Sequence, residues 1–230
     1  MDNKNTFILS GSVLVAALVV AGALIYNAGT RSLKEVIPNN VPEAGDLEAL
    51  KPVTDKDHLR GNLNAPVKII TFEDTECPFC KRFHITMQQI VKKYGDQVVW
   101  VYRHFPLESL HSQARKEANA LECVAALGGN NAFWIMLDKV FETTPSNNGL
   151  DLSLVPALAV QSGVNQSQFQ KCWDENKYDQ IVSDQLADAT AVGGQGTPFS
   201  IVIGKDGKKY PVNGALPYEP VKAVVEQASR

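Results

Sequence analysis

Two cysteines separated by two residues are the feature of this sequence best suited to chemistry. Cys77 and Cys80 form a C-x-x-C motif in the segment ECPFCKRFH, and Pro78 follows the first cysteine directly. Sulfurs at this spacing can bind a metal ion, form a structural disulfide, or exchange disulfides with another protein. The residues around the motif decide between these three kinds of chemistry.

The motif lies where a helix is expected to begin. Proline is favoured at the first helical position, which makes Cys77 the N-cap residue. There the free backbone N–H groups of Phe79 and Cys80 and the positive end of the helix dipole stabilise a thiolate. We therefore expect Cys77 to have a lowered pKa and to be the attacking sulfur. Cys80, one turn along the helix and less exposed, is expected to close the disulfide.

A zinc site is the main alternative. Cys77, Cys80 and His84 have the spacing C-x2-C-x3-H, which offers three ligands. Structural zinc sites usually take a second ligand pair from another motif, whereas Cys123 and Cys172 stand alone in helical sequence. The sequence therefore favours redox exchange over zinc binding or a purely structural bond. It predicts no metal and no cofactor, and it places His84 on the exposed face of the helix.

The segments around the motif predict a βαβ unit. Residues 67–72 are mostly apolar and β-branched, which is typical of a strand buried on both faces. A helical pattern follows the motif and stops at Gly95, and the segment QVVWVYRHFP predicts a second strand that ends at Pro106. This order places Cys77 at the turn from strand to helix.

The remaining sequence predicts a block of helices and then a second half. Residues from about 107 to 192 have helical patterns, strands follow at 199–203 and 209–212, and a helix over 218–228 closes the chain. Within this part, Trp134 and Trp173 are expected in the core, and His104 and His111 are expected to cap or cover a helix start. The fold class is therefore α/β: a thioredoxin fold with a helical insertion between its βαβ and ββα halves.

A proline before the predicted strand 199–203 agrees with this fold. Thr197 and Pro198 lie in the segment GGQGTPFS, in a loop that faces the C-x-x-C motif in such a fold, where a cis proline belongs. A cis bond would leave the backbone of Thr197 free to pair with an extended peptide. We predict that the substrate-binding residues are Pro78, Phe79, Thr197 and Pro198, with Phe79 in an apolar rim.

The amino-terminal residues predict a membrane or export segment. Residues 7–26 are uncharged and long enough as a helix to cross a bilayer. The sequence Ala-Gly-Ala at 21–23 fits a signal cleavage site, but the apolar run continues to Tyr26, so a retained anchor is favoured over a cleaved signal. Either alternative places the rest of the chain where disulfides persist, provided that the amino terminus stays inside.

The predicted organisation has three parts: a signal-anchor over residues 1–26, a tether over 27–65, and the thioredoxin-like domain over 66–230. A net charge of −3 without a long basic run argues against nucleic-acid binding, and we expect a monomer. Cys123 and Cys172 are each in an apolar setting, where free cysteines are ordinary core residues. The oxidising compartment favours a bridge between them, which we predict, with a stabilisation of about 4 kcal/mol from loop closure.

The sequence resembles the DsbA-like thiol–disulfide oxidoreductases of bacteria, in the branch anchored to the membrane by its own amino terminus. The resemblance covers about residues 57–230 and lies in the segments GNLNAPVKIITFEDTECPFCKRF, HFPLESLHSQARKEANALECV and GGQGTPFSIVIG. It implies that Cys77 is the nucleophile, Cys80 the resolving cysteine and Pro198 the cis residue. It also implies reduced exported proteins as substrates and a membrane quinone-linked thiol oxidase as the partner that restores the disulfide.

Two departures from the family pattern bear on the direction of exchange. Phe79 stands where the best-known members have histidine, and Thr71 stands where many relatives have a buried acid. Three carboxylates near the motif disfavour a thiolate, while two cations and the helix dipole favour it. These charged residues are Glu73, Asp74, Glu76, Lys81 and Arg82. We expect an oxidant milder than the histidine-bearing members.

The predicted function is to introduce disulfide bonds into exported proteins, on the extracytoplasmic side of the bacterial cytoplasmic membrane. A disulfide isomerase or reductase of the cell envelope is one alternative, because a threonine before the cis proline and an aromatic residue in the dipeptide also occur among such enzymes. A non-catalytic binding or chaperone module, in which the cysteines only stabilise the fold, is the other.

Overall fold

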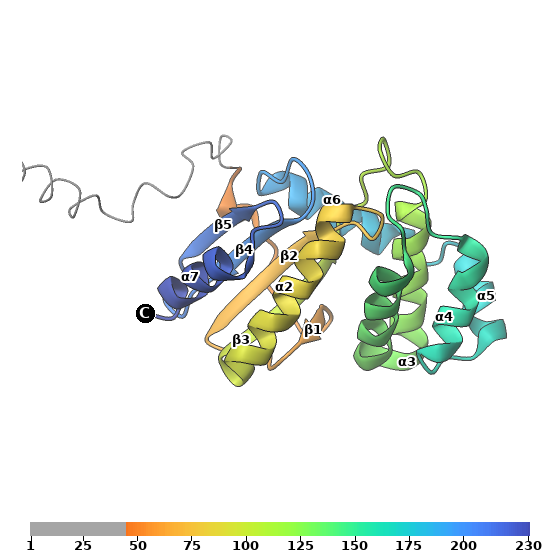
Figure 1. The fold of residues 1–230 in the computed structure, drawn as a ribbon, viewed down its shortest axis with the longest axis horizontal. Coiled ribbons are helices and arrows are strands. Elements are labelled where there is room, and N and C mark those ends of the chain that lie inside the picture. The colour runs from red at the N-terminus through yellow and green to blue at the C-terminus, as the bar shows by residue number, and fades with distance from the viewer. Residues whose placement is uncertain (1–44) are drawn as a thin grey trace, which may run out of the picture. The chain divides into compact units, whose positions relative to one another are not determined.

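A five-stranded mixed sheet forms the centre of the fold in the computed structural model, which describes residues 45–230 (Figure 1). The strand order is β1-β3-β2-β4-β5. Strand β2 pairs in parallel with β3 and antiparallel with β4, while β1 and β5 pair antiparallel at the two edges. The strands are β1 (His58–Arg60), β2 (Val67–Glu73), β3 (Val98–His104), β4 (Phe199–Ile203) and β5 (Lys209–Asn213).

Helices cover both faces of this sheet, and the helical insertion extends to one side (Figure 1). Helices α2 and α7 pack against one face, and α6 packs against the other. The α-helices are α2 (Pro78–Tyr94), α3 (Ala114–Thr143), α4 (Val155–Gln161), α5 (Gln166–Asp174), α6 (Asp179–Ala191) and α7 (Tyr218–Ala228). Short 3-10 turns lie at Leu47–Ala49, Gly95–Gln97 and Leu152–Leu154. The thioredoxin fold with a helical insertion is confirmed.

The alternation of side chains along β2 determines which of its residues face α2, the helix that begins at the motif. Ile70 and Phe72 join the core on the α6 side, whereas Ile69 joins the core on the α2 side. Successive strand residues point to opposite faces, so Thr71 and Glu73 share the α2 side with Ile69. A carboxyl group is thus placed under the start of α2, at the end of the central strand.

Helix α3 is kinked at a glycine near its middle. Gly129 has φ 76° and ψ −176°, which divides Ala114–Thr143 into two helical pieces across a kink. This is the single helix within residues 45–230 that is long and apolar enough to cross a membrane. Most of its large apolar side chains, among them Leu121, Phe133 and Leu137, are buried in the core of the domain.

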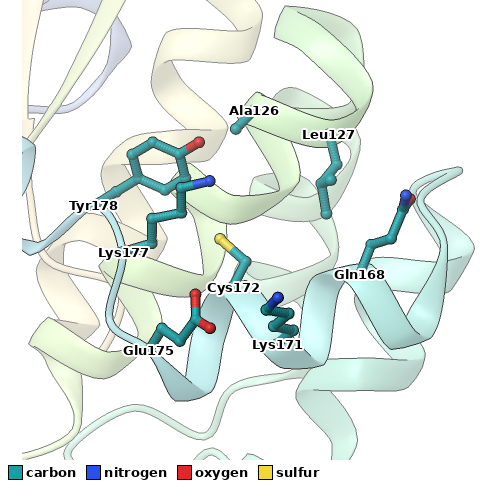
Figure 2. A pocket seen from close by; sticks show the side chains of 8 residues that line it. All are labelled: Ala126, Leu127, Gln168, Lys171, Cys172, Glu175, Lys177 and Tyr178. Atoms are coloured by element: carbon teal, nitrogen blue, oxygen red, sulfur yellow. The ribbon is translucent and has the colours of Figure 1, made fainter.

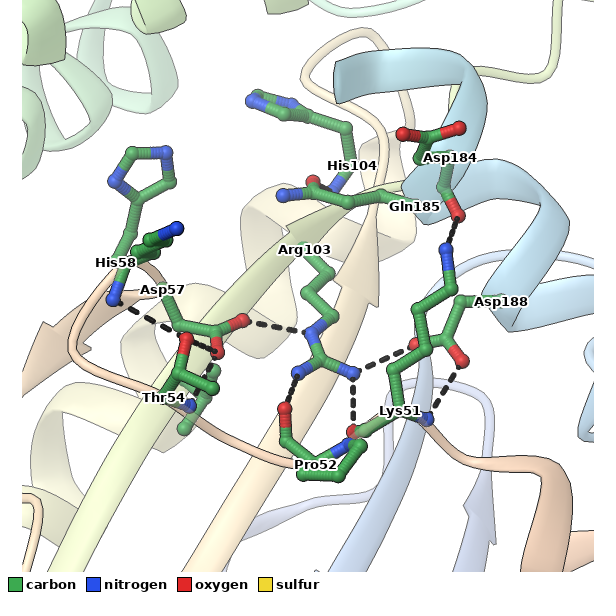
Figure 3. A network of polar contacts seen from close by, with 12 residues as sticks. Lys51, Pro52, Thr54, Asp57, His58, Arg103, His104, Asp184, Gln185 and Asp188 are labelled. Carbon is green, nitrogen blue, oxygen red and sulfur yellow. Dashed lines mark hydrogen bonds and ion pairs between the residues drawn. The ribbon is translucent and has the colours of Figure 1, made fainter. Parts of the chain in front are cut away.

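The predicted tether is too long at its carboxyl-terminal end. β1 adds a strand to the sheet within the segment predicted as tether, and residues 45–230 all belong to one compact unit. Arg103 from β3 is buried and holds the segment before β1 in place (Figure 3). Its guanidinium pairs with Asp57 at 2.8 Å and also donates to the carbonyls of Lys51 and Pro52. The sequence of this segment resembles a linker because it has no apolar periodicity; hydrogen bonds and ion pairs to polar and backbone groups hold it in place. The predicted signal-anchor over residues 1–26, and the tether up to residue 44, lie outside the described residues.

Candidate active site

The two cysteines of the motif lie at the start of α2, as predicted. Cys77 is the N-cap residue with extended backbone angles, and Pro78 occupies the first helical turn. Both cysteines are free thiols in this structure, with Cys77 3% exposed and Cys80 fully buried. The N–H of Cys77 donates to the carbonyl of Asp74 at 3.1 Å, which fixes the turn that leads into the helix.

Hydrogen bonds to the sulfur of Cys77 lower its pKa to about 6. The largest contribution is a bond from the Cys80 thiol, followed by bonds from the Thr197 side chain and the backbone N–H groups of Cys80 and Phe79. Burial opposes the shift but is weaker than these donors together. Near neutral pH the sulfur of Cys77 is therefore mostly a thiolate, which is the reactive form in disulfide exchange.

Cys80 has the opposite character. Burial raises its pKa well above the ordinary value of a cysteine, and the hydrogen bond to Cys77 and the negative potential of Glu73 add to the shift. The N–H of Asp74 donates to its sulfur at 3.5 Å, which offsets part of this effect. When Cys80 leaves from a disulfide it must therefore take up a proton.

Glu73 is an acid that can supply this proton, because its carboxyl group interacts electrostatically with Cys80. Its side chain is 1% exposed, and neither carboxyl oxygen has a hydrogen-bond partner in the part of the chain that the structure describes. Burial raises the pKa of Glu73 to about 8, so the group is mostly protonated near neutral pH. A protonated Glu73 close to Cys80 can supply a proton to the departing thiolate.

The charged side chains near the motif have partners and environments that the sequence does not indicate. Glu73 is neutral near pH 7, so it does not act as the charge that the sequence suggests. Lys81 donates to the carbonyl of Thr144 at 2.6 Å, and Arg82 lies over the Phe79 ring at 5.3 Å. The largest contributions that lower the pKa of Cys77 come from hydrogen-bond donors.

Glu76, the residue before the nucleophile, fixes a neighbouring loop. Its carboxylate accepts hydrogen bonds from the N–H groups of Gly149 at 3.1 Å and Leu150 at 3.3 Å, and its carbonyl accepts from Asn147 at 2.8 Å. Burial, together with a hydrogen bond to Glu76, raises the pKa of Glu117 to about 9. The hydroxyl of Thr75 donates to the Glu117 carboxyl group at 2.6 Å, so this residue of α3 attaches the helical insertion to the active-site turn.

The cis-proline loop meets Cys77 from the other side. The Thr197–Pro198 bond is cis, as predicted, and the thiol of Cys77 donates to the carbonyl of Thr197 at 3.4 Å. The hydroxyl of Thr197 is buried and has no partner among residues 45–230 while Cys77 is a thiol. When the thiolate forms, this hydroxyl can donate to it, which accounts for its part in lowering the pKa of Cys77.

Two large apolar side chains are exposed, one within the motif and one in the loop that follows β3. Phe79 is 54% exposed, as expected for a peptide-binding rim. Leu110, which sequence reasoning missed, is 67% exposed in a loop whose Leu107 N–H donates to Asp74 at 2.8 Å. No helical or strand periodicity marks a residue in such a loop, so its exposure was not predictable.

The histidines are placed differently from the prediction in two cases. His84 is buried, not exposed, and its Nε2 lies 2.7 Å from the carboxylate of Asp138. It does not converge with Cys77 and Cys80 as a metal ligand within residues 45–230. His104 is buried at the end of β3 and does not cap a helix, whereas His111 lies before α3 and contacts Asp74 at 2.9 Å.

The second cysteine pair forms a disulfide, as predicted. Cys123 of α3 and Cys172 of α5 are bonded across a separation of 49 residues, with their Cα atoms 5.9 Å apart. Cys172 borders an open pocket whose other lining residues lie on α3, α5 and the segment after α5 (Figure 2). None of the active-site residues described above lines this pocket.

Comparisons with known proteins agree with this geometry. The thioredoxin family matches residues 53–227. Pseudomonas aeruginosa DsbA2 has a similar structure, with a TM-score of 0.66 and 25% identity over 78% of this chain and 97% of that one. Bacillus subtilis BdbD, in its oxidised form, has a TM-score of 0.67 and 22% identity over 78% of this chain and 96% of that one, which supports the fold alone.

Curated relatives are larger proteins. The chain is 34% identical over 166 residues to a Na(+)/H(+) antiporter, NhaA 1, of Mycolicibacterium vanbaalenii, and this match covers 71% of the chain. It is 37% identical over 95 residues to NhaA 3 of Salinispora tropica, which covers 41% of the chain. The match spans 26% of the first relative and 14% of the second, so the chain corresponds to a fraction of their length.

Proposed function

Because the chain belongs to the thioredoxin family and has the DsbA-like fold, we propose that it introduces disulfide bonds into exported proteins by exchange at Cys77 and Cys80. The observation that carries this proposal is the contrast between the two sulfurs. Cys77 is stabilised as a thiolate with a pKa of about 6, whereas burial raises the pKa of Cys80. Stabilising the reduced, thiolate form makes a dithiol–disulfide couple more oxidising.

The exchange proceeds in two steps. A substrate thiolate attacks the sulfur of Cys77 in the Cys77–Cys80 disulfide, the S–S bond breaks, and Cys80 leaves and takes a proton from Glu73. A second substrate thiolate then attacks the substrate sulfur of the mixed disulfide, and Cys77 leaves as a stable thiolate. Two electrons pass from the substrate to the chain, which is left with Cys77 and Cys80 reduced.

The substrate is proposed to bind across the start of α2 and the cis-proline loop. Phe79 supplies exposed apolar surface, and Pro78, Thr197 and Pro198 would line the side of Cys77 from which a peptide approaches. An extended segment paired with the backbone of Thr197 would present its cysteine to Cys77. Reduced exported proteins, with exposed and unfolded cysteine segments, fit such a surface.

Location and partners form part of the same proposal. The uncharged segment 7–26 would anchor the chain in the cytoplasmic membrane, with the folded domain on the extracytoplasmic side as a monomer. A disulfide between Cys123 and Cys172 agrees with an oxidising compartment. A membrane quinone-linked thiol oxidase would restore the Cys77–Cys80 disulfide. Antiport is not proposed, because the chain matches about a quarter of NhaA 1.

Paired activity assays test the proposal. The oxidised full chain should form disulfides in a reduced, unfolded protein faster than it catalyses insulin reduction, and Cys77→Ser should abolish both activities. Preferential insulin reduction or disulfide reshuffling would instead support a reductase or isomerase. No activity in the wild type would support a non-catalytic module.

An equilibrium titration against glutathione tests the expected strength of the oxidant. The presence of Phe79 at the position where the best-known relatives have histidine predicts a couple less oxidising than theirs. A reduction potential as high as theirs would contradict this part of the proposal.

A further inference from the structure

A buried cluster of two histidines and a glutamate lies on the α2 side of the sheet, apart from the two cysteines. Nε2 of His58 is 2.7 Å from Oε1 of Glu122, and Nε2 of His104 is 3.1 Å from the same oxygen. The three residues come from β1, β3 and α3. All three side chains are buried, and Figure 3 shows the rings of His58 and His104 at its edge.

The three side chains form a metal-binding donor set. Their ligand atoms, one from each residue, all lie within 4.8 Å of one another, and no other group of three such residues within residues 45–230 converges in this way. Two imidazole nitrogens and one carboxylate oxygen are the protein ligands of several zinc sites, where each bond is about 2.0–2.2 Å long. Small movements of these side chains would bring one ion within bonding distance of all three atoms.

The charge of the cluster also favours a cation. Glu122 is a buried carboxyl group, and its oxygen Oε1 lies within hydrogen-bond distance of the rings of His58 and His104. No lysine or arginine forms an ion pair with Glu122 in the described part of the chain. A buried carboxylate is costly unless a positive charge compensates it, and a divalent ion would supply that charge.

Aromatic packing holds the ligands in position. The Phe133 ring stacks on His58 with centroids 3.6 Å apart and planes 10° apart, and it meets His104 edge-on at 6.2 Å. Tyr102 meets His104 edge-on at 5.2 Å. These contacts fix the ring planes and limit the access of water, as in metal sites whose surroundings are preorganised.

We propose that His58, His104 and Glu122 bind one zinc ion, which joins β1 and β3 to the helical insertion. The nitrogen and oxygen ligands remain usable in an oxidising compartment, where thiolate ligands are lost to disulfides. The ion would stabilise the fold and would hold the segment before β1 in place, because β1 follows that segment directly. The site is independent of exchange at Cys77, so either proposal can fail without the other.

Metal titration of the untagged full chain tests this proposal. The Cys77–Cys80 pair is first oxidised to a disulfide, so that its thiols cannot bind the metal, and a chelator removes any ion already bound. We expect one zinc ion per chain after dialysis, a zinc-dependent rise in melting temperature, and the absorption of four-coordinate Co²⁺ when cobalt replaces zinc.

Three variants make the test specific. Glu122→Gln and His58→Gln should each lower zinc affinity at least about 100-fold, because each removes one ligand. His84→Gln is the matched control: His84 is a buried histidine paired with Asp138 at the same 2.7 Å, but it has no second histidine beside it. It should bind zinc as the wild type does.

Other outcomes would overturn the proposal. If the wild type binds no stoichiometric zinc and gives no cobalt spectrum, the cluster is a hydrogen-bonded support of the fold and not a metal site. A purely structural cluster also predicts that Glu122→Gln lowers the melting temperature by the same amount with and without zinc. The cobalt measurement uses only the wild type, so a variant that fails to fold does not remove the test.

Discussion

Replacing Cys80 with alanine should raise the pKa of Cys77, because the Cys80 thiol is the strongest of the donors that lower this pKa to about 6. A hydrogen bond to a charged acceptor contributes about 1.5–3 kcal/mol, and one pKa unit corresponds to about 1.4 kcal/mol. The expected rise is therefore about one to two units. At pH 7 the thiolate fraction of Cys77 would fall from about 90% to between about one half and one tenth.

The pH dependence of alkylation at Cys77, followed by mass spectrometry of the labelled peptide, measures this pKa directly. Cys80→Ser is the matched control, because its hydroxyl can still donate to the thiolate and should retain most of the lowering. The reasoning is refuted if Cys80→Ala and Cys80→Ser titrate together, or if Cys80→Ala leaves the pKa of Cys77 near 6.

Three further predictions concern stability, each measured by denaturant unfolding. Glu73→Gln should raise the free energy of unfolding relative to the wild type, and the difference should grow with pH. The pKa of Glu73 is raised in the folded state to about 8. The wild type therefore loses stability as the pH rises from about 4.5 to 8, by up to about 1.4 kcal/mol per pH unit. A difference between variant and wild type that does not grow over this window would contradict the assignment. Replacing Cys123 and Cys172 by alanine should cost about 4 kcal/mol through the loss of a 49-residue loop constraint, whereas an unchanged midpoint would argue against the bridge. Arg103→Met should cost about 3–5 kcal/mol, because it leaves the buried Asp188 carboxylate 2.6 Å away without its partner. Arg115→Met breaks only partly exposed ion pairs and should cost less than about 1 kcal/mol of unfolding free energy. Equal losses in the Arg103 and Arg115 variants would refute the distinction between buried and exposed pairs.

Local signals account for the parts of the fold that the sequence predicts well. Helix α2 begins at Pro78 and ends before Gly95, as the apolar spacing and these two residues indicate. The cis bond at Pro198 and the Cys123–Cys172 bridge also follow, since the fold class fixes what faces the motif and the predicted compartment favours oxidation. In each case the deciding information lies within a few residues or in the order of the elements.

Long-range polar contacts account for what the sequence does not predict. His84 looks like a surface residue until Asp138, 54 positions away, provides a partner for its ring. Glu73 looks like a charge beside the nucleophile until burial makes it neutral near pH 7. Periodicity records which positions are apolar, but it does not record which polar side chains meet in the interior, so the residues before β1 and the cluster around Glu122 escape it.

Trapping of substrate in cells tests the central claim most directly. In Cys80→Ala the Cys77 thiolate can still attack a disulfide of an exported protein, which breaks that bond, releases one protein thiolate and forms a mixed disulfide. The variant lacks the sulfur that would resolve this mixed disulfide from within the chain. We predict covalent complexes with exported proteins that appear on non-reducing gels, disappear on reduction, map to Cys77 by mass spectrometry, and are absent from the Cys77→Ala, Cys80→Ala double variant. If the single variant carries no such complexes, the chain does not exchange disulfides with proteins at Cys77.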